Sequence, residues 1–171
     1  IAISKFHPIE SVILALDSGV RVFGENRVQE AGEKFLQLRA KYPDIELHCT
    51  GNLQTNKIKQ ALKIFDVFHT IYKEKQLIEF AKYPQDTSKK RFFLQVNTGY
   101  EENKIGVHPK DIKKLLHLCK NKYHLNISGL MCIPPINDNP SKHFNLLKEL
   151  KEKYNLGSLS MGMSNDYEKA I

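Results

Sequence analysis

Lys5 is the first residue whose type and position could do chemistry, because it directly follows the short apolar run at residues 1–4. A lysine that ends a buried strand places its amine at the edge of the protein interior. Removal from water favours the neutral amine, which is a nucleophile that condenses with aldehydes and ketones. In the alternative interpretation, the aliphatic stem lies on the protein and the ammonium group reaches solvent.

A second candidate is the segment LSMGMSND at residues 159–166, where an expected strand runs into Gly162 and then Ser164 at the expected start of a helix. Such a turn collects unpaired backbone N–H groups and the positive end of a helix dipole, so it can bind a phosphate group. Alternatively, Ser164 caps the first turn of its own helix. The residues alone leave both interpretations open.

Two further loops place small and amide residues after a strand, FGENRVQE at residues 23–30 and TGNLQTNKIK at residues 50–59. Amide side chains hold a ligand by hydrogen bonds without adding charge. Each loop taken alone is better explained as a turn followed by a helix cap, with Asn26 and Asn56 as the capping residues.

The histidines and cysteines show no metal-binding motif. No pair of histidines has the i, i+4 spacing of a helical zinc motif, and Cys49, Cys119 and Cys132 lie far apart without a CxxC pair. We therefore expect no metal, reduced thiols and a cytoplasmic location. His48 and His69 fall on expected strands, where a hydrogen-bonded interior histidine is the usual role, although His48 could line a pocket.

Composition describes an ordinary globular protein, with 171 residues of which 41% are hydrophobic and 26% are charged. No apolar run approaches the roughly 18 to 20 residues that cross a bilayer, so we expect no membrane association. The net charge of +7 is spread between apolar residues at helical spacing, as at residues 57–63 and 148–153. That pattern is typical of solvated helix faces, and we expect no nucleic-acid partner.

Short β-branched runs alternate with amphipathic stretches along the chain, which indicates βα units and a parallel sheet. The intervening helices carry apolar residues three or four positions apart, as at residues 28–38, 112–119 and 144–150. Two polar stretches, residues 84–91 and 134–141, are expected to be surface loops. Seven strands are expected, at residues 1–4, 20–23, 45–50, 64–70, 92–97, 127–132 and 157–162.

Seven tandem units predict an α/β fold, a TIM-type (β/α)8 barrel whose functional residues lie at the carboxyl ends of the strands. Because such a barrel has eight strands and typically about 250 residues, we expect residues 1–171 to form a single barrel domain that lacks the last strand and is incomplete at both ends. The alternative is a doubly wound open sheet, but no GxGxxG turn follows the first strand.

Taken in order, six motifs resemble one family, the pyridoxal phosphate homeostasis proteins, also called the YggS/PROSC family. The resemblance covers the whole chain, and the family is similar in fold to the N-terminal barrel of bacterial alanine racemase. In the family, the chain continues into a last strand of the type VRIGxxIFG, whose residues also hold the cofactor. The motifs are IAISKFHP, FGENRVQE, HCTGNLQTNK, FFLQVNTGYEENKIG, SGLMCIP and LSMGMSNDYEKAI.

The resemblance implies that the protein holds pyridoxal 5′-phosphate (PLP) as a Schiff base on Lys5 and takes part in intracellular vitamin B6 homeostasis. It places Asn26 beside the pyridine ring and Met131 in the pocket wall. Ser160 and the turn through Gly162 would contact the phosphate. The implied cofactor-binding residues are Lys5, Asn26, Met131, Ser160, Gly162 and Ser164.

Binding this cofactor does not by itself make an enzyme, because racemisation needs acid and base groups on both faces of the substrate carbon. We expect a monomeric carrier without a reaction of its own, with PLP-dependent apo-enzymes as partners. The alternatives are a PLP-dependent racemase-like enzyme, a Schiff-base aldolase-type enzyme, and a basic nucleic-acid-binding module, for which the net charge is the one argument.

Overall fold

Seven parallel strands form one sheet in the order β1 to β7 in the computed structural model, which describes residues 1–102 and 104–171. The strands are β1 (Ala2–Ile3), β2 (Val22–Glu25), β3 (Glu46–Cys49), β4 (Val67–Ile71), β5 (Arg91–Gln95), β6 (Ile127–Met131) and β7 (Ser158–Ser160). The α-helices are α1 (Ile9–Asp17), α2 (Val28–Lys41), α3 (Ile58–Ile64), α4 (Glu74–Phe80), α5 (Pro84–Thr87), α6 (Ile112–Asn121), α7 (Pro140–Lys153) and α8 (Tyr167–Ala170). Two short 3-10 helices, η1 (Thr55–Lys57) and η2 (Pro109–Asp111), precede α3 and α6.

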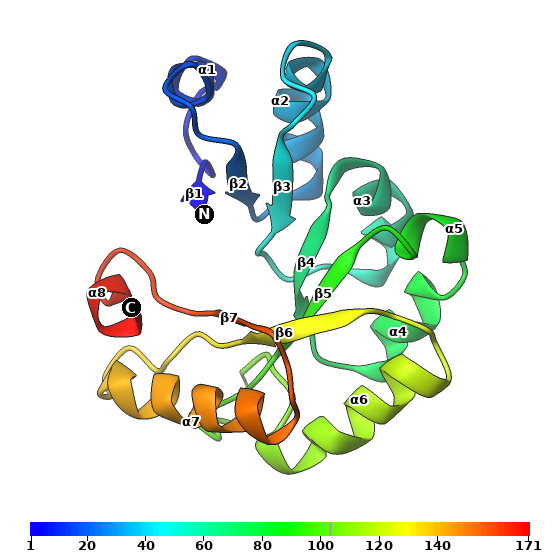
Figure 1. The fold of residues 1–171 in the computed structure, drawn as a ribbon, viewed down its shortest axis with the longest axis vertical. Coiled ribbons are helices and arrows are strands. Elements are labelled where there is room, and N and C mark those ends of the chain that lie inside the picture. Colours follow the sequence, from blue (N-terminus) through cyan, green and yellow to red (C-terminus); the bar gives the residue numbers. More distant parts are fainter. Residues whose placement is uncertain (103) are drawn as a thin grey trace.

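The sheet curls into an incomplete barrel with the helices on its outer side (Figure 1). Each strand pairs in parallel with the next one along the chain, so β1 and β7 are the two edge strands. The barrel opens between these edges (Figure 1). This arrangement confirms the expected TIM-type barrel of seven strands.

The main core lies between the outer side of the sheet and the helices. Phe68 of β4 stacks on Phe92 of β5 with ring centroids 5.4 Å apart, and its edge meets Phe80 of α4 at 5.1 Å. Side chains alternate between the two faces of a strand. Val67 and Phe93, the neighbours of these aromatic residues, therefore face the barrel interior, where they form a separate apolar cluster with Met131.

Gly129 allows β6, β7 and Phe93 to approach closely. A Cβ atom at Gly129 would lie 2.1 Å from the carbonyl oxygen of Ser158 and 2.7 Å from Cε1 of Phe93. Both distances are far below van der Waals contact, so this position accepts no side chain without moving the backbone. Interior packing at β6 therefore depends on a residue that has no Cβ.

Two sequence expectations are corrected here. Residues 84–91 are not a continuous loop, because Pro84 opens α5, where its fixed φ suits the first helical position. The strand expected at residues 64–70 begins at Val67, since Ile64 is still part of α3 and contributes to its buried face. No helix among the described residues is long and apolar enough to cross a bilayer.

We expect Phe68→Ala to lower the free energy of unfolding by about 3 to 5 kcal/mol, because it removes a fully buried ring from the aromatic cluster. Urea denaturation followed by circular dichroism measures the loss. Phe6→Ala is the matched control, since Phe6 is 74% exposed and should change stability by less than about 0.5 kcal/mol. Equal effects of the two substitutions would contradict this description of the core.

Candidate functional site

The carboxyl ends of the seven parallel strands face one rim of the barrel, and the residues singled out from the sequence lie along it. Lys5 is in the turn that follows β1, and Asn26 directly follows β2. Met131 and Ser160 are the last residues of β6 and β7. The loop between β7 and α8 carries the remaining two, Gly162 and Ser164.

Lys5 is exposed, and its Nζ atom lies 5.9 Å from the ring centroid of Phe6. Of the two interpretations of Lys5 given from the sequence, the described residues therefore show the solvent-exposed one. The physical reason is that β1 is an edge strand paired only with β2, so no neighbouring strand covers the side of the rim next to Lys5.

A buried ion pair anchors the turn that carries Lys5. The fully buried carboxylate of Glu25, at the end of β2, accepts hydrogen bonds from Lys34 Nζ at 2.5 Å and from Ser4 Oγ at 2.8 Å. Lys34 also donates to the carbonyl oxygen of Ser4 at 2.9 Å. Helix α2 is thereby tied to the backbone immediately before Lys5. The sequence analysis missed this pair, although a glutamate inside an apolar strand signals a buried partner.

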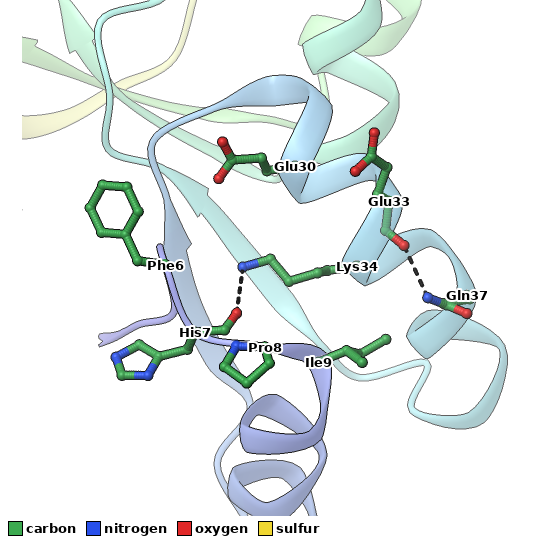
Figure 2. A pocket seen from close by; sticks show the side chains of 8 residues that line it. All are labelled: Phe6, His7, Pro8, Ile9, Glu30, Glu33, Lys34 and Gln37. Carbon is green, nitrogen blue, oxygen red and sulfur yellow. Dashed lines mark hydrogen bonds between the residues drawn. The ribbon is translucent and has the colours of Figure 1, made fainter.

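A surface hollow of ≈ 520 Å³ lies between the β1–α1 loop and α2, where Lys34 also donates to the carbonyl oxygen of His7 at 3.3 Å (Figure 2). Its walls come from residues 6–9 and from the side of α2 that carries Glu30 and Glu33. These are residues of the outer helical layer and of the loop leading into it. The hollow is therefore separate from the rim residues predicted to bind a ligand.

Asn26 is held at the rim with an unused acceptor. Its Oδ1 atom is buried and has no hydrogen-bond partner among the described residues, and the same is true of Oε2 of Glu25. A Cβ atom at Gly51 would lie 2.1 Å from the carbonyl oxygen of Asn26, so the loops after β2 and β3 touch through their backbones. A buried acceptor without a partner is costly, and a ligand that donates a hydrogen bond would satisfy it.

The turn between β7 and α8 has a conformation that suits glycine, because Gly162 has a φ of 84°. The N–H of Met163 donates to Oδ1 of Asp166 at 2.5 Å, and α8 begins after Asp166. Ser164 is therefore not the capping residue of this helix. Because α8 has four residues, its dipole would add little to the phosphate site predicted here, whose donors would be backbone N–H groups of the turn and Ser160.

A chain of hydrogen bonds links Ser160 to two histidines inside the barrel. His69 Nδ1 lies 2.7 Å from Ser160 Oγ, and His69 Nε2 lies 2.7 Å from His48 Nδ1. His48 Nε2 is in turn 2.7 Å from Glu46 Oε1, and the second carboxylate oxygen of Glu46 accepts from Arg91 at 2.5 Å. The expectation of hydrogen-bonded interior histidines is confirmed, but the sequence did not connect them to Ser160.

Burial keeps both histidines neutral. It lowers the pKa of His69 to about 3, and the charges of a protonated His48 and of Arg91 act in the same direction. Burial also lowers the pKa of His48, although the hydrogen bond to Glu46 opposes this effect. Burial would raise the pKa of Glu46, but the hydrogen bond from His48 and the charge of Arg91 outweigh it and bring the pKa below its ordinary value.

The three cysteines do not contribute a nucleophile. Cys49, Cys119 and Cys132 are free thiols and buried, and burial raises the pKa of each to about 12. A protonated thiol is a poor nucleophile and a poor metal ligand. The described residues contain no group of three or more His, Cys, Asp or Glu side chains that could hold a metal ion.

Comparison with known proteins shows similarity over the whole described fold. The family described as alanine racemase, N-terminal domain, matches residues 2–170. A pyridoxal phosphate homeostasis protein of Vibrio cholerae is 36% identical over 182 residues, which cover 100% of this chain and 77% of that protein. The protein of the same name from Aquifex aeolicus is 36% identical over 178 residues, covering 98% of this chain and 77% of that protein.

Solved structures agree with this result. PipY of Synechococcus elongatus, determined with PLP bound, superposes with a TM-score of 0.86 and 31% identity, covering 99% of this chain and 84% of PipY. An alanine racemase of Clostridium difficile gives a TM-score of 0.69 with 12% identity and covers 92% of this chain and 42% of the racemase. The second similarity shows the shared fold alone.

We expect the free energy of unfolding to decrease as the pH falls from about 6.5 toward 3. The pKa of His69 is about 3 in the fold against an ordinary 6.5, so in this range the unfolded chain binds a proton that the folded chain does not. Urea denaturation at a series of pH values measures the slope. His69→Gln should make it shallower, whereas His7→Gln, at an exposed position, should leave it unchanged. A slope unaffected by His69→Gln would contradict the assignment.

Lys34→Met should destabilise the protein by about 3 kcal/mol, because it leaves the buried Glu25 carboxylate without its charged partner. The same denaturation experiment measures this loss. Adding Glu25→Gln should recover part of the stability by removing the buried charge. Lys82→Met is the control, since Lys82 is exposed and the loss of its pair with Glu79 should have little effect. A Lys34→Met protein as stable as the control would argue against the anchoring role.

Proposed function

Because the chain belongs to the pyridoxal phosphate homeostasis proteins, a family with the fold of the alanine racemase N-terminal domain, we propose that it binds PLP at the barrel rim and carries it on Lys5 in vitamin B6 homeostasis. One observation carries the proposal. The rim brings an amine after β1, an unsatisfied amide acceptor after β2 and a hydroxyl group at the end of β7 to the same edge of the barrel.

The residues present suit the chemical groups of this cofactor. Ser160 and the turn through Gly162 and Ser164 offer hydroxyl and backbone N–H donors to a phosphate. Met131 supplies an apolar wall that packs with Phe93 and Val67. Asn26 offers a buried, unpaired Oδ1 as acceptor for a donor group on the ring. A PLP-bound structure of PipY, 31% identical to this chain, supports the assignment.

PLP supplies an aldehyde carbon, which forms a bond to an unprotonated amine with loss of one water. Lys5 is the amine at the rim, and exchange with a second, incoming amine would release the cofactor. That amine could belong to an amino acid or to the lysine of a PLP-dependent apo-enzyme.

The titratable group that contacts Ser160 is not suited to acid–base catalysis at neutral pH. His69 is neutral and stacked on Phe93 with ring centroids 4.6 Å apart, and it lies below the rim in the barrel interior. We therefore propose a carrier without a catalytic reaction of its own, as the name shared by its relatives suggests. A monomeric state, a cytoplasmic location and delivery to apo-enzymes are parts of this proposal.

Reductive trapping tests the proposal. Incubation with PLP, reduction with borohydride and peptide mapping should place one added pyridoxyl group on Lys5, and the label should be absent from Lys5→Ala. Lys75→Ala removes an exposed lysine of α4 and should leave the labelling of Lys5 unchanged. Labelling scattered over surface lysines, at the same level in wild type and Lys5→Ala, would refute the carrier function.

A further inference from the structure

The hydrogen-bonded chain behind Ser160 lies in an apolar part of the barrel interior. His69 is 1% exposed and His48 is 6% exposed. The ring of His69 is nearly parallel to that of Phe93, at an interplanar angle of 7°, and Phe93 packs with Val67 and Met131. No alternative partner competes for the ring nitrogens, since each is already paired. Each proton of the hydrogen-bonded chain therefore lies between one defined donor and one defined acceptor.

The Glu46 carboxylate, at one end of the chain, determines the direction of every hydrogen bond in it. Glu46 is ion-paired with Arg91 and is an acceptor, so His48 must donate from Nε2. A neutral His48 then accepts at Nδ1, and His69 must donate from Nε2. The Nδ1 atom of a neutral His69 is consequently an acceptor, and Ser160 must donate its hydroxyl proton to it. Ser160 thus presents lone pairs to the rim.

A bound phosphate requires the opposite orientation of the Ser160 hydroxyl group, because an anion accepts hydrogen bonds and repels lone pairs. We propose that His48 and His69 are positioning residues for Ser160. Binding of a phosphate group at Ser160 is then accompanied by the uptake of one proton from solvent, which His48 holds next to Glu46. The inference rests on the proposed function, in which Ser160 contacts the phosphate.

In the free protein His48, His69 and Ser160 carry one proton each. With phosphate bound, Ser160 donates to the phosphate and accepts from His69 Nδ1, while His69 Nε2 accepts from His48 Nδ1. His48 still donates from Nε2 to Glu46, so it carries two protons, and the additional one comes from solvent. The Glu46 carboxylate stabilises this imidazolium.

The surrounding charges set the balance between the two states. Glu46 on β3 is the anionic group facing His48, His69 on β4 is neutral, and Arg91 at the start of β5 is a nearby cation that opposes protonation. A phosphate dianion at Ser160 adds negative charge at the other end of the chain and favours the protonated state.

Calorimetry of phosphate binding tests the inference. Pyridoxine 5′-phosphate is the probe, because it has no aldehyde and cannot react with Lys5. Titrations in buffers of different ionisation enthalpy count the protons taken up. Wild type should take up one proton more per bound probe than His69→Gln, whose amide can present either a donor or an acceptor to Ser160 by rotation. The probe's own titration is common to both proteins and cancels.

The affinity of wild type for the probe should accordingly fall more steeply with rising pH, by roughly tenfold per pH unit relative to His69→Gln. His143→Gln is the matched control, because His143 is also buried but bonds to Thr98 and Asp138 and should keep the wild-type proton count. Ser160→Ala, on an edge strand, should weaken binding and lose the extra proton.

Equal proton counts in wild type, His69→Gln and Ser160→Ala would overturn the inference alone and leave phosphate binding intact. In that case the Ser160 hydroxyl rotates toward the phosphate without a change at His69. A wild-type protein that does not bind the probe would overturn the proposed function together with the inference. The two failures are therefore distinguishable in one series of titrations.

Discussion

Parallel pairing of seven consecutive strands is the constraint on which the rest of the structure depends. Because every strand runs in the same direction, every carboxyl end reaches the same rim. Residues 5, 26, 131 and 160 therefore lie on the same rim, although most of the chain separates the first from the last. Each connection must also return across the sheet, so the helices are placed on the outer side, where they cover the aromatic core around Phe68 and Phe92.

The two faces of the sheet have different roles. The outer face is apolar and packs against the helices, with aromatic and aliphatic side chains fully buried. The interior face combines the small cluster of Val67, Phe93 and Met131 with the chain from Arg91 through the two histidines to Ser160. Such a polar chain is tolerated in the interior because each member is paired, and it connects the start of β3 and β5 to the rim.

The two edge strands carry Lys5 and Ser160, the two ends of the predicted site. Lys5 follows β1, an edge strand, and is accessible from solvent, while its backbone is held by the Glu25–Lys34 pair. Ser160 at the opposite edge is fixed from behind by His69. Side-chain contacts thus hold the backbone before Lys5 and the hydroxyl group of Ser160 at the two edges of the sheet.

The sequence by itself determined the class of fold and the identity of the rim residues. Alternating β-branched and amphipathic segments predict the order of elements, and the residue after each strand predicts the rim, because both follow from local periodicity. Only the tertiary structure decided that His69 touches Ser160, that Lys34 reaches Glu25 and that Lys5 is exposed. His69 and Ser160 are 91 positions apart, and their contact depends on how far the sheet curls. Curvature and edge exposure arise from the packing of all strands together, so no local pattern encodes them.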